Sequence, residues 1–195
     1  PGIETVKVKG RGKASLEKFI AHVKQEYPQV NVYAVDTMEE AVRDADIVSA
    51  STSTPTGDPA EYPYIKESAL ISSTAALRFD DDFIINRART VTDNIKLYEA
   101  WEEEMKPNAY NTVPIPAVHV MDLIADGKMQ PEQVDDLGDI LMGRIPVHRK
   151  DDEIIVYSIG GMPVEDVAWG TMVYRNALAK GIGTKLTLWN TPQMI

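Results

Sequence analysis

The first half of the chain alternates short apolar runs, typical of strands, with stretches whose apolar residues repeat at helical spacing. Residues 6–8 alternate valine with lysine and stop at Gly10, which is typical of a strand and its end. Residues 14–27 carry apolar side chains along one face and polar ones along the other, and therefore predict a helix. Thr37 is a good N-cap for a short helix at 38–43. Further strands are expected at residues 30–35, 46–50, 69–72 and 90–92.

The second half is mainly helical by the same criterion. Helices are expected at residues 98–105, 117–126, 131–142 and 163–180, and one strand is expected at residues 153–158. The last helix has the clearest start, because Pro163 suits the first helical position and Glu165 and Asp166 favour its positive end. Strands that alternate with helices through short connections are typical of a parallel sheet. The predicted fold class is therefore α/β, with a doubly wound parallel sheet.

Composition narrows the possible functions. The chain has 195 residues, a net charge of −10, 44% hydrophobic residues and no cysteine. This length is enough to bury a hydrophobic core, whereas the acidic excess argues against nucleic acid and against an anionic membrane surface. The apolar stretches are too short to span a bilayer. The lack of cysteine excludes disulfides and thiolate metal sites, and it fits a cytoplasmic location.

A basic cluster follows the first predicted strand. Arg11 and Lys13 lie there, Ser15 opens the next helix, and residues 5–16 contain no carboxylate. In dinucleotide-binding folds an acidic side chain near this point binds a free ribose 2′-hydroxyl, whereas arginine suits a 2′-phosphate. The cluster suits a phosphate bound by Arg11 and by the helix N-terminus. An ordinary solvated turn is the alternative, and spacing alone favours it.

A Ser/Thr-rich segment follows the strand expected at 46–50. Ser51, Thr52 and Ser53 come directly after it. In open α/β sheets ligands lie outside the carboxyl ends of the strands, and small hydroxyl residues there permit close approach of a cofactor ribose or diphosphate. Taken alone, a flexible polar loop is the simpler interpretation.

Two other strand ends carry candidate residues. Ser158 is followed by Gly160 and Gly161, and such a turn either presents backbone N–H groups to a ligand or packs tightly. Asp93 follows the strand at 90–92 and is a speculative active-site acid or base, with a structural cap as the alternative. No metal is expected, because the histidines lack ligand spacing and are interpreted as surface residues. These histidines are His22, His119 and His148.

Three segments resemble the ornithine cyclodeaminase/mu-crystallin family. Residues 155–168 (IVYSIGGMPVEDVA) resemble its S-V-G-x-x-x-x-D segment, residues 136–144 (DLGDILMGR) its LGEVLxGR stretch, and residues 41–48 (AVRDADIV) its EAVRGADIV stretch. These segments occur in matching order along nearly the whole chain. Within the family, the sequences of these segments most resemble the tyramine oxidase branch.

The resemblance implies an NAD(P)-binding Rossmann-like domain at residues 1–161 and a C-terminal helix and tail at 162–195, which return to a dimerisation and substrate domain. Family members reduce or form imines of amino acids by hydride transfer at the nicotinamide, or cyclise ornithine. We therefore expect NADP, with NAD as the other possibility, an amino acid or imine substrate, and a homodimer. The implied cofactor-binding residues are Arg11, Lys13, Ser15, Ser51, Thr52, Ser53, Ser158, Gly160 and Gly161.

The chain also departs from the family pattern. The first strand and its glycine-rich turn are missing before Pro1, so we expect the sequence to be the later part of a longer protein, one that binds cofactor poorly by itself. Family cyclodeaminases place a catalytic Asp near Ala76, where this chain has no carboxylate until Asp80. The leading prediction is therefore an NADP-preferring oxidoreductase for an amino acid, its imine or a related amine. The alternative is a non-catalytic, mu-crystallin-like NADP-binding or accessory protein.

Overall fold

The computed structural model describes residues 2–51, 62–74, 77 and 79–187. The chain divides into two compact units, Pro1–Gly160 and Gly161–Ile195, which are treated separately below. Among the described residues no helix is long and apolar enough to cross a membrane.

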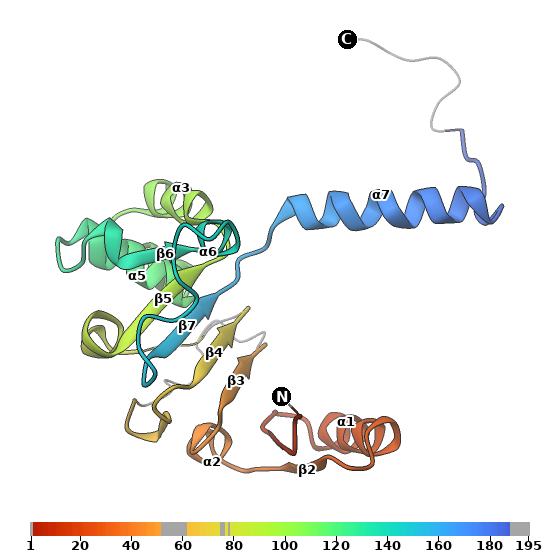
Figure 1. Ribbon diagram of the computed structural model, residues 1–195, viewed down its shortest axis with the longest axis horizontal. Coiled ribbons are helices and arrows are strands. Elements are labelled where there is room, and N and C mark those ends of the chain that lie inside the picture. The colour runs from red at the N-terminus through yellow and green to blue at the C-terminus, as the bar shows by residue number, and fades with distance from the viewer. Residues whose placement is uncertain (1, 52–61, 75–76, 78, 188–195) are drawn as a thin grey trace. The chain divides into compact units, whose positions relative to one another are not determined.

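The first unit contains all the strands and most of the helices (Figure 1). Its strands are β1 (Thr5–Val8), β2 (Asn31–Ala34), β3 (Ile47–Ala50), β4 (Leu70–Ser73), β5 (Ala88–Thr92), β6 (Val134–Asp136) and β7 (Ile154–Ser158). Its α-helices are α1 (Lys13–Glu26), α2 (Met38–Val42), α3 (Ile95–Met105), α4 (Ala109–Thr112), α5 (Pro116–Ala125) and α6 (Leu137–Leu141). Shorter turns of helix are the 3₁₀ segments η1 (Tyr62–Tyr64) and η3 (Pro131–Gln133) and the π-helical segment η2 (Phe83–Arg87).

The strands form two sheets, and every pairing in them is parallel. The larger sheet has the order β3-β4-β7-β5-β6, and the smaller one pairs β1 with β2. The prediction of an α/β fold with a parallel sheet is confirmed. Because all strands of the larger sheet run in the same direction, their carboxyl ends lie along one edge.

The core lies between the five-stranded sheet and the helices that pack on it. Ile71 of β4 and Val156 of β7 are register neighbours, and both are fully buried. Val118 is fully buried on α5, which contacts β5 and β7. The ring of Phe83 in η2 stacks on Phe79 at a centroid distance of 4.7 Å. Each of these apolar side chains contributes about 1.5–3 kcal/mol on full burial.

Thr37 caps α2, as the sequence predicts. The backbone N–H of Glu40 donates to Thr37 Oγ1 at 3.1 Å, and Glu40 Oε2 accepts from the backbone N–H groups of Asp36 (2.9 Å) and Thr37 (3.2 Å). These backbone donors lower the pKa of the Glu40 carboxyl. The reciprocal bonds form a capping box, which is why so short a segment starts a helix at this residue.

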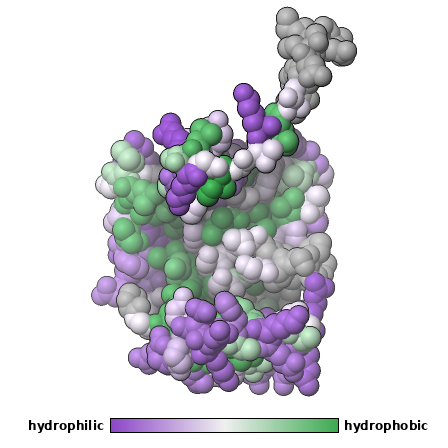
Figure 2. All heavy atoms as spheres, turned by 90° about the vertical axis from the view of Figure 1, so that its right-hand side faces the viewer, coloured by the Kyte–Doolittle hydropathy of each residue, from purple (hydrophilic) through white to green (hydrophobic). Residues whose placement is uncertain are grey.

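The second unit consists mainly of α7 (Pro163–Ala179). Pro163 lies in its first turn together with Glu165 and Asp166, in agreement with the predicted start. The apolar side chains of α7 remain exposed, and they include Val164, Val167, Trp169, Met172, Val173, Tyr174 and Leu178. Figure 2 shows that apolar side chains also remain exposed between the more polar regions of the face that it presents.

The helix expected at residues 131–142 is wrong. This stretch begins with η3, continues as strand β6 and forms a helix only over Leu137–Leu141 (α6). β6 pairs with β5, and the side chain of Asp135 is buried there. A carboxylate is rarely buried without a partner, so its position in the sheet depends on an arginine that local spacing does not reveal.

That arginine is Arg89 of β5. Its side chain is 4% exposed, and Nε donates to Asp135 Oδ2 at 2.6 Å while Nη1 approaches Glu153 Oε2 at 3.2 Å. The guanidinium also donates to the carbonyls of Pro146 (2.8 Å) and Val147 (2.7 Å). Arg89 thus ties the loop that precedes β7 to the strands β5 and β6.

We expect Arg89→Met to lower the free energy of unfolding by about 3–5 kcal/mol. The buried Asp135 would keep only the half-exposed Arg149 as a cation, at 2.7 Å, and Glu153 and the carbonyls of Pro146 and Val147 would lose their donor. Arg144→Met is the matched control. Arg144 forms an exposed pair with Asp139 at 2.7 Å, and such pairs contribute less than about 1 kcal/mol. Urea unfolding followed by circular dichroism measures both. Equal effects of the two substitutions would contradict a structural role for the Arg89 network.

Candidate functional site

The carboxyl ends of β3, β4, β7 and β5 form the candidate functional site. Backbone hydrogen bonds continue beyond the strand ends, from Ile159 N to Ser73 O at 2.8 Å and from Asp93 N to Ser158 O at 3.2 Å. In open α/β sheets, ligands bind outside the carboxyl ends of the strands. We therefore define the strand-end site as Ser51, Thr74, Asp93, Ser158 and Gly160.

Ser51 lies at the end of β3 and pairs with a residue that follows β4. Its Oγ is 3.1 Å from Thr74 Oγ1, which donates to Ala50 O at 3.2 Å. Either hydroxyl can be the donor in the Ser51–Thr74 contact, and the oxygen of each has lone pairs that can accept a further hydrogen bond. Ser51 is exposed and therefore presents a hydrogen-bond acceptor at the site. Thr52 and Ser53, also predicted to bind cofactor, lie outside the described residues.

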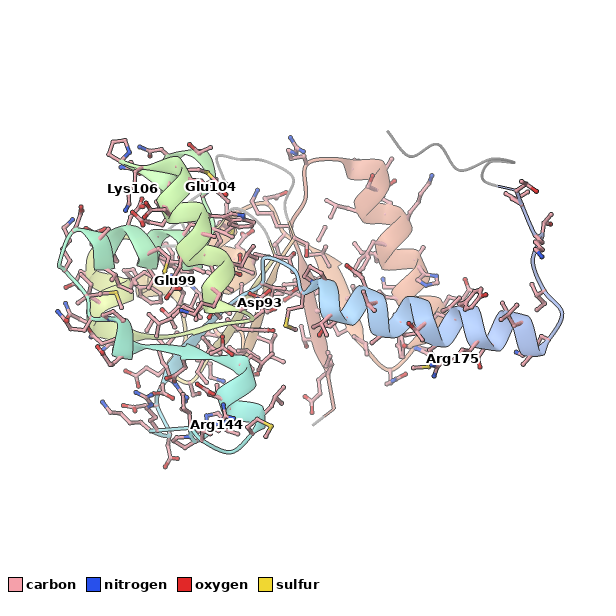
Figure 3. The ribbon with its side chains drawn as sticks, turned by 90° about the horizontal axis from the view of Figure 1, so that it is seen from above. Asp93, Glu99, Glu104, Lys106, Arg144 and Arg175 are labelled. Atoms are coloured by element: carbon pink, nitrogen blue, oxygen red, sulfur yellow. The ribbon has the colours of Figure 1, made fainter. Side chains whose placement is uncertain are left out.

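Asp93 connects three elements at the site. It is 4% exposed, and its Oδ1 accepts hydrogen bonds from the Tyr98 hydroxyl (2.6 Å) and from Asn94 N (2.9 Å). Its Oδ2 accepts from Gly160 N at 2.9 Å. Figure 3 shows Asp93 at the start of α3, with Glu99, Glu104 and Lys106 farther along that helix. Asp93 therefore links β5, α3 and the end of β7.

Tyr98 is the buried partner of Asp93 and was not expected from the sequence. Its ring is fully buried and lies edge-on to Trp101 at a centroid distance of 5.7 Å. Its hydroxyl is also 3.3 Å from Ser158 O. Burial and the neighbouring Asp93 carboxylate raise the pKa of the Tyr98 phenol far above its usual range. The only signal in the sequence is its position in a helix, five residues after Asp93.

The end of β7 differs in detail from its expected role. Ser158 is fully buried, and its Oγ accepts from Ala117 N at 3.1 Å, near the start of α5. A Cβ on Gly160 would come within 2.9 Å of Tyr98 Oη and 3.1 Å of a Leu97 methyl carbon. Gly161 has φ +114°, a conformation that L side chains rarely adopt. Packing requires glycine at the first position, and backbone conformation requires it at the second.

The basic cluster lies elsewhere, on the connection between β1 and α1. Arg11, Lys13 and Ser15 are all exposed there. The N-cap of α1 is Gly12, which makes no side-chain capping bond, and the first turn contains no acidic residue. The positive end of this helix thus adds to the charge of the cluster. The structure places these residues beside the two-stranded sheet rather than among the strand ends of the larger sheet.

The interpretation of His119 as a surface residue is wrong. His119 is 6% exposed, its Nε2 lies 2.8 Å from Asp81 Oδ1, and its ring stacks on Tyr110 at 4.4 Å. Asp122, on the same face of α5, accepts from the backbone N–H groups at the start of α4. These distant partners turn an apparently polar helix face inward. His22 and His148 are exposed. Within the described part of the chain, no group of acidic and histidine side chains forms a metal site.

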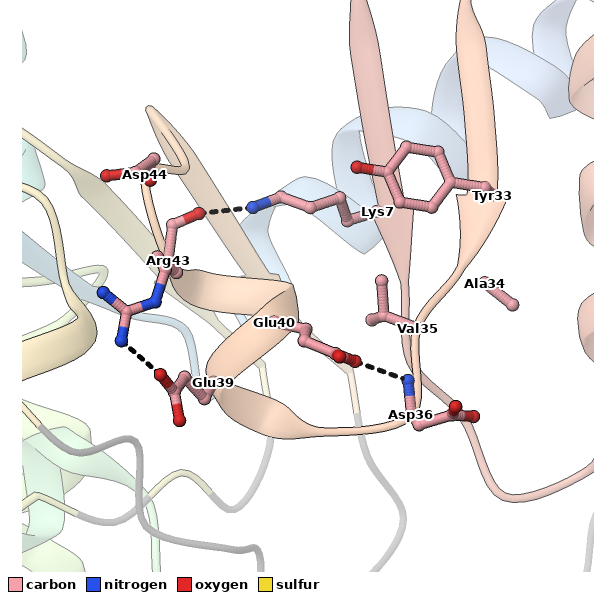
Figure 4. Close-up of a pocket in the computed structure, with 9 residues that line it drawn as sticks. All are labelled: Lys7, Tyr33, Ala34, Val35, Asp36, Glu39, Glu40, Arg43 and Asp44. Atoms are coloured by element: carbon pink, nitrogen blue, oxygen red, sulfur yellow. Dashed lines mark hydrogen bonds and ion pairs between the residues drawn. The ribbon is translucent and has the colours of Figure 1, made fainter.

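A cavity of about 490 Å³ lies between α2 and the small sheet (Figure 4). Both of its cations have partners within the lining: Lys7 Nζ donates to Arg43 O, and the Arg43 guanidinium pairs with Glu39. The cavity is therefore not a convergent set of free donors or acceptors, and we do not assign chemistry to it.

Comparisons with known proteins match this architecture. The sequence model of the ornithine cyclodeaminase/mu-crystallin family matches residues 1–181. N-((2S)-2-amino-2-carboxyethyl)-L-glutamate dehydrogenase of Staphylococcus aureus (strain NCTC 8325 / PS 47) is 28% identical over 189 residues, which cover 96% of this chain and 51% of that protein.

Two solved structures share the fold. An archaeal alanine dehydrogenase dimer with bound NAD is 22% identical with a TM-score of 0.70, covering 96% of this chain and 53% of its own. Thermococcus litoralis Δ1-pyrroline-2-carboxylate reductase, solved with NADH and L-proline, is 18% identical with a TM-score of 0.72, covering 94% and 53%. The chain thus spans about half the length of each relative.

We expect the raised pKa of Tyr98 to lower stability at alkaline pH. Below about pH 10 the phenol is protonated in both the folded and the unfolded chain. Above that value the unfolded chain releases the proton while the folded one keeps it, so the free energy of unfolding falls as pH rises. Tyr98→Phe should remove part of this slope, whereas Tyr27→Phe, at an exposed tyrosine, should not. Urea unfolding between pH 8 and pH 11 measures the slopes, and identical slopes would refute the assignment.

Proposed function

The chain belongs to the ornithine cyclodeaminase/mu-crystallin family, and on that premise we propose that it is part of an NAD(P)-dependent oxidoreductase acting on an amino acid, its imine or a related amine. The observation that carries the proposal is the strand-end site itself. At this site β3 and β4 are followed by the exposed hydroxyl pair of Ser51 and Thr74. β7 is followed by Gly160, whose N–H donates to the buried Asp93 carboxylate. The matched relatives include a dehydrogenase and a reductase, one solved with NAD and the other with NADH.

The residues present fit a dinucleotide. The exposed Ser51 offers acceptor lone pairs to ribose hydroxyls, and Thr52 and Ser53 are proposed to extend this contact. Gly160 and Gly161 leave backbone without side chains beside the open edge, where a nicotinamide ring can approach. When bound, the cofactor supplies the hydride chemistry, and the protein supplies position and electrostatics.

The preference for NADP is a separate part of the proposal. Arg11 and Lys13 place positive charge beside the uncapped N-terminus of α1, and the strand end carries no carboxylate for a free 2′-hydroxyl. Ser15 adds a hydroxyl in the first turn of that helix. These features support binding of a 2′-phosphate. The two relatives above were solved with NAD and NADH, so the preference has to be tested directly.

The small sheet has an edge that suits another strand. In β1 the carbonyls of Glu4 and Val8 accept hydrogen bonds from β2, for example from Val35 N at 3.0 Å. Since backbone groups alternate sides along a strand, the N–H and C=O groups of Thr5 and Lys7 are directed to the opposite edge. Within the described residues no strand pairs with that edge.

The five-stranded sheet has a similar edge at β3. The carbonyls of Asp46 and Ala50 accept hydrogen bonds from the β4 side, so the backbone of Ile47 and Ser49 is directed outward. The Ile47 side chain is 58% exposed, although strands of parallel sheets are usually covered on both faces.

We propose that a parallel strand from outside this sequence lies between β1 and β3. It would join both sheets in the order typical of doubly wound dinucleotide-binding folds and would end in the glycine-rich turn that holds the diphosphate. The two edges, with outward backbone groups on Thr5 and Lys7 and on Ile47 and Ser49, support this placement.

The second unit is proposed to take part in a dimerisation and substrate domain, as the homodimer prediction requires. α7 exposes seven large apolar side chains, and a water-soluble helix seldom leaves so many uncovered without a partner. The alanine dehydrogenase relative was solved as a dimer, which agrees with this assignment.

A non-catalytic cofactor-binding protein is the second candidate. The sequence has no carboxylate between Glu67 and Asp80, where the resemblance places a catalytic Asp in cyclodeaminases. The similarity to the tyramine oxidase branch rests on short sequence motifs, whereas the Staphylococcus aureus relative is a dehydrogenase. Neither observation identifies a substrate.

The two candidates differ in turnover. We expect the complete protein to bind NADPH or NADH in a fluorescence titration and to oxidise the reduced cofactor with cyclic imines, or with keto acids plus ammonia. Binding without turnover across this panel would favour the non-catalytic candidate. Failure to bind either nucleotide would contradict both and leave an α/β interaction domain as the remaining interpretation.

Charge reversal tests the phosphate role of the basic cluster. We expect Arg11→Glu to weaken NADPH binding at least about tenfold and NADH binding less than about threefold, because only NADPH carries the 2′-phosphate. Lys24→Glu, in the last turn of α1, is the matched control and should affect the two cofactors equally. Isothermal titration of the complete wild-type protein and of both variants gives the six dissociation constants. An equal loss for both cofactors in Arg11→Glu would remove the selector role.

A further inference from the structure

We infer that Asp93 and Tyr98 are positioning residues that fix the β7 exit (residues 158–160) against the nicotinamide end of the bound cofactor. This inference rests on the proposed function. It adds the buried residue Tyr98 to the site, and it assigns Asp93 the role of fixing the backbone of Gly160.

The first argument is how the Asp93 carboxylate is used. Three groups donate to it: the Tyr98 hydroxyl at 2.6 Å and the backbone N–H groups of Asn94 and Gly160 at 2.9 Å each. A carboxylate held in this way, with both oxygens engaged and only 4% exposed, is suited to fixing its donors.

The second argument is that Asp93 is not needed to cap α3. The neighbouring Asn94 does so, because its Oδ1 accepts from Lys96 N at 3.2 Å. The bond from Gly160 N to Asp93 Oδ2 spans 67 residues and belongs to no helix or strand ladder. Its structural consequence is therefore confined to the β7 exit.

The third argument is the two-sided environment of Gly160. The residue is exposed, yet a Cβ placed on it would lie 2.9 Å from Tyr98 Oη and 3.1 Å from Tyr98 Cε1. One side of this backbone therefore rests on the buried tyrosine, while the residue remains open toward the carboxyl edge of the sheet. Tyr98 acts on a bound ligand through the β7 exit, which it contacts at Gly160 and at Ser158 O (3.3 Å).

Two substitutions separate these contacts. Tyr98→Phe keeps the ring that supports Gly160 but removes the donor to Asp93. Asp93→Asn keeps the size of the side chain, but its NH₂ group must face one of the three former donors, which pushes that donor away. Asp93→Asn should therefore disturb the exit more than Tyr98→Phe. Asp126→Asn and Tyr27→Phe are the matched controls at exposed positions.

The decisive measurement compares two ligands of the complete protein: the reduced dinucleotide, and ADP-ribose or its 2′-phosphate, which lacks the nicotinamide. We expect Asp93→Asn to raise the dissociation constant of the dinucleotide at least about tenfold and Tyr98→Phe to raise it about three- to tenfold. Both should change binding of the ADP-ribose ligand less than about twofold. A general loss of structure would weaken both ligands together, which would overturn the inference.

Hydrogen exchange of the Gly160 amide provides a readout without cofactor. We expect slow exchange in the wild type and at least about tenfold faster exchange in Asp93→Asn, with the control variants unchanged. If Asp93→Asn does not fold, Tyr98→Phe decides both measurements. If the wild type binds no dinucleotide, the proposed function fails. If it binds but neither variant shifts the ratio between the two ligands, the positioning inference alone fails.

Discussion

The parallel pairing of β4, β7 and β5 is the constraint on which the rest of the structure depends. Parallel strands bring all their carboxyl ends to one edge, so residues far apart in sequence meet there because their strands are paired. Ser51 reaches Thr74 because β4 also pairs with β3, and Asp93 reaches Gly160 because β5 pairs with β7. Neither pair is visible in local sequence, and each becomes a neighbour once the strand order is fixed.

β5 carries a buried ionisable side chain near each of its ends, and the two have different consequences. Arg89, near the amino end, is paired with carboxylates and holds the loop before β7. Asp93, after the carboxyl end, is bonded to neutral donors and holds the exit from β7. Opposite charges compensate each other at the first position, so its contribution is to stability. At the second position the carboxylate accepts from Tyr98 and from Gly160 N, so its contribution is to the geometry of the β7 exit.

Much of the fold was predictable because it depends on local chemistry. Apolar runs marked β3, β4, β5 and β7, and Thr37 with Glu40 marked the start of α2. The failures share one cause, a buried polar group whose partner lies far along the chain. Asp135 belongs to a strand because of Arg89, and His119 is buried with Asp81. The candidate site was predictable as a set of strand ends, but the contribution of Tyr98 was not, since its spacing resembles any helical core position.

The two glycines after β7 show how one sequence signal combines separate physical requirements. A glycine pair at a strand end predicts close approach of a ligand, yet Gly161 is required by its positive φ and Gly160 by the Tyr98 hydroxyl behind it. A side chain at Gly160 would clash with Tyr98 on the interior side, whereas the backbone of Gly160 is exposed at the carboxyl edge of the sheet. The position of the buried Tyr98 ring therefore determines where the exposed backbone of Gly160 lies. The constraint is strict, because a single methyl group there has no room.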